Sequence, residues 1–179
     1  NQDSAEAFIT SHTLELMVLN MVGSILLHYL LGGIYGMIKK GIVQNYADLG
    51  SAYSTIFSKN GLKALNVIIL IQLTNTLVGY FLDIAGFSLV GLGLSILVQF
   101  LTYFAIPAIY IDGLGIRKSI AFSVKTINQK PGFLFVFIAF AYFLSFIGVL
   151  FFGIGIILTL PLNYIVAYSL YKNIKEQTA

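Results

Sequence analysis

The chain of 179 residues is 58% hydrophobic and only 9% charged, and its formal net charge is +3. Soluble domains are about a quarter charged, so this chain has too few charges to cover a water-exposed surface. Its ten scattered Lys and Arg form no dense basic patch, which argues against nucleic acid as a partner. The lack of cysteine excludes thiolate chemistry and cysteine-bound metals. We therefore predict an integral membrane protein.

Five apolar segments follow one another along the chain, at about residues 14–38, 64–82, 88–111, 133–151 and 154–171. Each is close to the ~20 residues that a helix needs to cross ~30 Å of hydrocarbon. The apolar runs are continuous, whereas a barrel strand facing lipid alternates apolar and polar residues. The sequence therefore predicts an all-α integral membrane helical bundle with five transmembrane helices.

The two long connections between these segments have helical periodicity of their own. Apolar residues recur at steps of three and four within residues 41–58, and again within residues 114–129. This spacing is typical of amphipathic helices that lie along a membrane surface. We predict one such surface helix in each connection.

Every cation of the chain lies in the connections that follow the first, third and fifth segments. The ten are Lys39, Lys40, Lys59, Lys63, Arg117, Lys118, Lys125, Lys130, Lys172 and Lys175. With five spans these connections share one face of the membrane, and the positive-inside rule makes that face cytoplasmic. We predict a multi-pass protein of the bacterial inner membrane with a cytoplasmic C-terminus. Because the first residue then lies outside, we expect a sixth span before it in the complete protein.

The two connections also share short sequence motifs. AYS at 52–54 and KNG at 59–61 match AFS at 121–123 and KPG at 130–132. The match predicts a repeated unit of surface helix, Lys-x-Gly turn and two-span hairpin. A second interpretation stays open, because any amphipathic loop rich in small residues would give a similar match.

A family resemblance rests on residues in the second half of the chain. They are Pro107, Ile111, Asp112, Ala121, Ser123, Lys130 and Gly132, followed by GIGIILTLPL at 153–162 and AYSLY at 167–171. This pattern resembles the polytopic membrane domain fused to some bacterial glycerophosphodiester phosphodiesterases, and its stand-alone relatives of undefined function. The resemblance covers most of residues 30–175 and implies a six-span helical inner-membrane domain. It supplies no catalytic residues, and the soluble phosphodiesterase domain is not in this chain.

Cations beside the membrane surface are the first group of candidate site residues. Lys59, Lys63, Arg117 and Lys118 flank the predicted spans, and each could gain about 1 kcal/mol from anionic headgroups. We predict a non-enzymatic membrane protein that interacts through them with lipid or with another membrane protein. Asp112 is expected to cap the following helix or to pair with Arg117 or Lys118.

Polar side chains within the spans are the second group. His28, Gln72, Asn75 and Gln99 lie in the first three apolar segments, and an ionisable group at membrane depth is a functional hypothesis by default. They predict an alternative function, a small-solute transporter or channel with a polar path between helices. The same groups could instead serve only as hydrogen bonds between the second and third spans.

The sequence lacks the common motifs of enzymes and cofactor-binding proteins. It has no GxSxG, HExxH or P-loop, and its two histidines are far apart in sequence. We therefore expect no catalytic activity, no metal and no cofactor.

Overall fold

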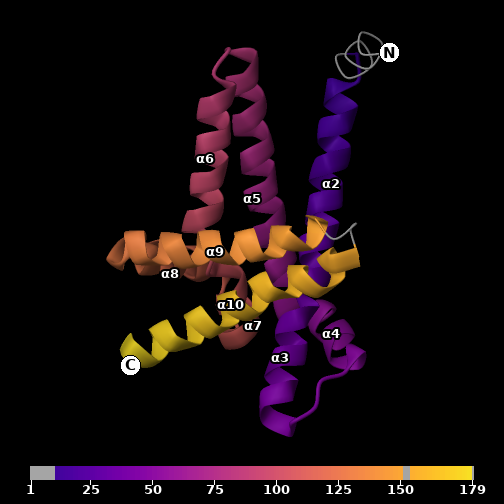
Figure 1. The fold of residues 1–179 in the computed structure, drawn as a ribbon, viewed down its shortest axis with the longest axis vertical. Helices are drawn as coiled ribbons and strands as arrows, with labels where there is room; N and C mark the ends of the chain where they lie inside the picture. Colours follow the sequence, from indigo (N-terminus) through magenta and orange to yellow (C-terminus); the bar gives the residue numbers. More distant parts are fainter. Residues whose placement is uncertain (1–10, 151–153, 179) are drawn as a thin grey trace.

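The computed structural model describes residues 11–150 and 154–178 of the chain. The predicted turn at 152–153 lies outside these residues. The helices are α2 (Thr13–Leu31), α3 (Gly33–Gln44), α4 (Leu49–Ile56), α5 (Lys59–Ile84), α6 (Ser88–Leu101), α7 (Ala105–Asp112), α8 (Ile116–Gln129), α9 (Pro131–Leu150) and α10 (Ile154–Thr178). Throughout the described residues the regular structure is helical, which confirms the all-α prediction (Figure 1).

Three helical stretches are long and apolar enough to cross a membrane: Thr13–Gln44, Lys59–Ile84 and Ser88–Asp112. A fourth is reached if the pair Ile116–Gln129 and Pro131–Ser145, bent by 110°, counts as one broken span. The helices α2, α5 and α6 run in a common direction, whereas α9 and α10 cross it (Figure 1). The membrane class is thus supported by the structure, while the predicted number of five spans stays a prediction.

The outer surface of the long helices is apolar. Leu19 and Leu30 on α2 are 69% and 58% exposed, Leu89 on α6 is 84% exposed, and Val136 and Phe143 on α9 are both exposed by more than half. An apolar surface of this extent is a liability in water, because monomeric soluble proteins expose only limited apolar patches. In hydrocarbon the same side chains are already in their preferred solvent.

The α5–α6 hairpin lies at the end of the molecule opposite α3 and α4 (Figure 1). Gly86, with a φ of +79°, makes the turn, and the Ser88 hydroxyl donates a hydrogen bond to the Asp83 carboxylate. The two helices pack closely at Gly91, whose Cα faces Leu82 and Gly79. With 26 residues, α5 is about 39 Å long and exceeds the hydrocarbon thickness.

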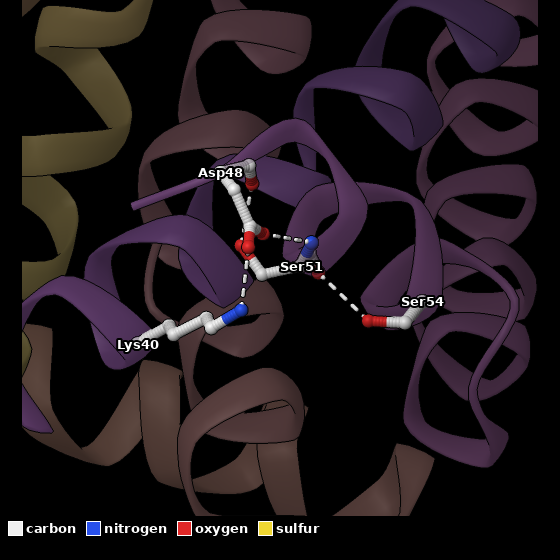
Figure 2. A network of polar contacts seen from close by, with 4 residues as sticks. All are labelled: Lys40, Asp48, Ser51 and Ser54. Carbon is white, nitrogen blue, oxygen red and sulfur yellow. Dashed lines mark hydrogen bonds and ion pairs between the residues drawn. The ribbon is translucent and has the colours of Figure 1, made fainter. Parts of the chain in front are cut away.

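The prediction of one surface helix over residues 41–58 is wrong. The preceding helix α3 continues to Gln44, Asn45 adopts a left-handed conformation with a φ of 58°, and α4 begins only at Leu49. Asp48 starts α4 because its Oδ1 accepts a hydrogen bond from the Ser51 N–H at 2.6 Å, an N-cap (Figure 2). By contrast, α8 lies within the predicted range of 114–129.

An ion pair ties the α3–α4 connection together. The Lys40 Nζ lies 2.5 Å from the Asp48 Oδ2, and the Ser51 hydroxyl donates to the Asp48 carbonyl at 2.6 Å (Figure 2). The Lys40 ammonium, together with the Ser51 N–H, holds the pKa of Asp48 below its ordinary value. The carboxylate therefore stays charged and keeps both contacts at neutral pH.

The short helix α7 lies at the centre of the packing. Its residues Ala105 and Ile109 belong to one buried cluster with α3, α5 and α10, and Ala108 belongs to a second with α8, α9 and α10. All three side chains are fully buried. Two alanines among them let neighbouring helices approach closely, as small residues do in membrane bundles.

The predicted span 88–111 is interrupted at residues 102–104, between α6 and α7. Pro107, which lacks an N–H, then falls in the first turn of α7, where an N–H would have no partner inside the helix. The interruption leaves two backbone groups without helical partners, and Ser123 of α8 binds both. Its Oγ accepts from the Phe104 N–H at 3.0 Å and donates to the Leu101 carbonyl at 2.7 Å.

Candidate functional site

The basic residues of the two connections meet at one place. The Lys63 Nζ, in the second turn of α5, donates to the Gly113 carbonyl at 3.1 Å and to the Asn60 Oδ1 at 3.3 Å. Gly113 ends α7 with a φ of +69° and precedes α8 by three residues. This contact brings the start of α5 to the start of α8, although the two are about 50 residues apart in sequence.

The other three predicted headgroup residues are exposed around this contact. Lys59 is the first residue of α5, and Arg117 and Lys118 are the second and third residues of α8. None of the three forms an ion pair with any residue in the described part of the chain. Helix N-termini carry partial positive charge, so two of them and three cations raise the potential here together. We call Lys59, Lys63, Arg117 and Lys118 the basic end.

Asp112 lies beside the basic end but points to another helix. Its carboxylate accepts hydrogen bonds from the Tyr171 hydroxyl and from the Lys175 Nζ, the latter at 2.7 Å. Both donors belong to α10, so the expected pairing of Asp112 with Arg117 or Lys118 is wrong. Asp112 fastens the end of α7 to α10 and leaves Arg117 and Lys118 available.

A cavity of about 90 Å³ lies where the parallel helices meet the crossing helices. Its wall includes side chains from α2, α3, α5, α6, α7, α9 and α10. Polar members of the wall besides tyrosines are His28, Gln72, Gln99, Thr102 and Asn163. Three of the four residues predicted for a polar path are therefore brought together.

Hydrogen bonds to α2 arrange two of these residues. The Gln72 Nε2 donates to the Ser24 Oγ at 2.8 Å, and the His28 Nδ1 lies 2.8 Å from the Ser24 carbonyl. The alternative interpretation, hydrogen bonds between the second and third spans, does not describe this bond of Gln72, which joins α5 to α2. The Thr102 hydroxyl, at the end of α6, donates to the Val98 carbonyl at 2.7 Å.

Four tyrosines complete the cavity wall: Tyr35, Tyr103, Tyr142 and Tyr164. The Tyr103 hydroxyl donates to the Asn163 Oδ1 at 2.8 Å. The ring of Tyr35 lies 5.6 Å from that of Tyr164 in an edge-on arrangement. Sequence reasoning missed these residues, although Tyr103, Tyr142 and Tyr164 lie well inside the predicted apolar segments, away from the usual interfacial belt, and could have been noticed.

Asn75, the fourth predicted path residue, does not line the cavity. Both polar atoms of its amide are buried, and within the described residues neither has a hydrogen-bond partner. A buried amide without a partner is costly in protein and in hydrocarbon alike. Asn75 therefore does not belong to the set of polar residues that lines the cavity with Gln72.

Comparison of the chain with protein-family models, with curated proteins and with solved structures finds no match. The resemblance to the membrane domain of glycerophosphodiester phosphodiesterases therefore stays a prediction. Function has to be inferred from the basic end and the cavity.

Proposed function

We propose that this chain is a non-enzymatic membrane protein that binds anionic lipid headgroups at its basic end. In this proposal the basic end lies at the cytoplasmic face of the bacterial inner membrane. The observation that carries it is the bond from Lys63 to the Gly113 carbonyl, which joins the starts of α5 and α8.

The positive charge of the basic end favours binding of a phosphate group. Lys59, Arg117 and Lys118 are exposed and have no anionic partner among the described side chains. Repulsion among like charges, together with the positive ends of two helices, is relieved when an anion binds between them. Lys63 has a structural role. Its ammonium already donates hydrogen bonds to Asn60 and Gly113, and it thereby holds the starts of α5 and α8 together.

Reversing the three exposed charges is the test. In a Lys59→Glu, Arg117→Glu, Lys118→Glu variant we expect binding of phosphatidylglycerol to weaken on the order of a hundredfold, at about 1 kcal/mol for each cation. Binding is measured by titrating the detergent-purified protein with this lipid in native mass spectrometry.

The matched control reverses three other exposed cations, Lys125, Lys130 and Lys172, which changes the net charge equally. We expect the control to lose much less affinity. Equal losses in both variants would show that only net charge matters, and no loss in the first would refute the proposal.

A second candidate function is passage of a small uncharged solute through the membrane. It is favoured by the cavity, which gathers His28, Gln72 and Gln99. Its test is solute flux into proteoliposomes containing the protein, with protein-free liposomes as the reference.

A further inference from the structure

Several polar groups of the cavity wall have no partner in the described part of the chain. Tyr35 and Tyr164 line the cavity, and their hydroxyls make no hydrogen bond to any of the described residues. The side-chain amide of Gln99 makes none either. These groups line the cavity, so a ligand bound there can supply their hydrogen-bond partners.

The hydrogen bonds of His28 determine what the ligand must offer. The His28 Nδ1 lies 2.8 Å from the Ser24 carbonyl, and a carbonyl only accepts, so Nδ1 carries the proton. In the neutral ring, Nε2 is then left as an acceptor. The tyrosine hydroxyls can donate, so the wall supplies both donors and acceptors. A hydroxyl group, which both donates and accepts, satisfies such a wall.

The wall also excludes a charged ligand. No Asp, Glu, Lys or Arg lines the cavity. An ion at this depth would lack a compensating charge and would be strongly disfavoured. The cavity has room for on the order of six water-sized atoms, about the size of a glycerol unit.

Access to the cavity is from the apolar surface. His28 and Gln99 are the exposed polar members of the wall. Their neighbours on the same helices, Leu27 and Leu30 on α2 and Ile96 on α6, are exposed and apolar. Along α5, Gln72 lies near the middle of the helix, roughly 20 Å from either end. A molecule dissolved in the bilayer reaches this depth more readily than one dissolved in water.

We infer that the cavity binds the hydroxyl-bearing head of an uncharged lipid, such as a diacylglycerol, with the acyl chains left along α2 and α6. The inference deepens the second candidate function, on whose cavity it rests, by naming the class of ligand. It needs no transport, because it concerns the bound state alone.

Titration of the purified protein with dioleoylglycerol in native mass spectrometry tests the inference. The Gln99→Leu variant removes one exposed amide from the wall and is expected to bind this lipid roughly tenfold more weakly, the effect of one lost hydrogen bond. Gln129→Leu is the matched control, since Gln129 is the exposed last residue of α8 and does not line the cavity. Tyr164→Phe, which keeps the ring, is expected to weaken binding in the same direction.

Three further probes separate the possible sources of the hydroxyl group. Dioleoylglycerol acetylated at its free hydroxyl should bind much more weakly, and dioleoylphosphatidylglycerol should not compete for the cavity. Free glycerol that binds as tightly as the lipid would overturn the lipid source. Undiminished binding by the acetylated lipid, or equal affinities in Gln99→Leu and Gln129→Leu, would overturn the inference. Loss of solute flux with lipid binding intact would instead reject only the transport function.

Discussion

Replacing Gly61 with alanine is expected to destabilise the protein by about 3 kcal/mol or more. A Cβ at this position would lie 1.9 Å from the Ile56 carbonyl oxygen, which is a backbone atom and cannot rotate away. The same oxygen accepts a hydrogen bond from the Tyr29 hydroxyl at 2.8 Å, so moving it also disturbs the contact with α2. The apparent melting temperature in detergent and the yield of monodisperse protein measure the effect.

The sequence offers a matched control for this substitution. Gly132 has the position in the KPG motif that Gly61 has in KNG, yet a Cβ at Gly132 would meet nothing within 4 Å apart from its chain neighbours and its own helix backbone. Gly132→Ala should therefore leave stability unchanged or raise it slightly. Equal destabilisation by the two alanines would contradict the steric explanation for Gly61.

Replacing Ser123 with alanine is expected to cost roughly 2 to 4 kcal/mol, because two backbone groups lose their partner at once. The Phe104 N–H and the Leu101 carbonyl are both bound by the Ser123 Oγ, and Phe104 is fully buried. Water cannot readily replace the hydroxyl at this depth. The free energy of unfolding, measured by titration of mixed micelles with denaturing detergent, gives the loss directly.

Ser54→Ala is the matched control for Ser123→Ala, since Ser54 is the last residue of the AYS motif as Ser123 is the last residue of AFS. Its side chain is exposed, and its hydroxyl donates only to the Ser51 carbonyl of the same helix, at 3.1 Å (Figure 2). Ser54→Ala is expected to change stability by no more than about 0.5 kcal/mol. If the two alanine substitutions lower the free energy of unfolding equally, the interruption between α6 and α7 does not depend on the Ser123 hydroxyl.

The helices were predictable from the sequence because hydrophobic runs and periodicity are local signals. They indicated α5 and α8 to within a few residues. The interruption at 102–104 was not predictable from its own neighbourhood, because it is stabilised by Ser123, about twenty residues further along the chain. The division of residues 41–58 could have been anticipated, since Asp48 is one of the residue types favoured at a helix N-cap.

The candidate cavity was predictable only in part. Polar residues inside apolar runs pointed to His28, Gln72 and Gln99, since such residues need partners in hydrocarbon. The sequence did not indicate that Tyr142 and Asn163 close the same cavity, because that depends on how α9 and α10 cross the other helices (Figure 1). Asn75 shares the periodicity of Gln72 but not its surroundings.

The hydroxyl of Ser123 has a consequence for how distant parts of the protein communicate. It holds Leu101 and Phe104, and the two residues between them, Thr102 and Tyr103, both line the cavity. Ser123 belongs to α8, whose first turn carries Arg117. If the proposed phosphate at Arg117 shifted α8, it would therefore also shift part of the cavity wall. The two proposed binding equilibria would then be thermodynamically linked, and each ligand would change the affinity of the other by the same factor.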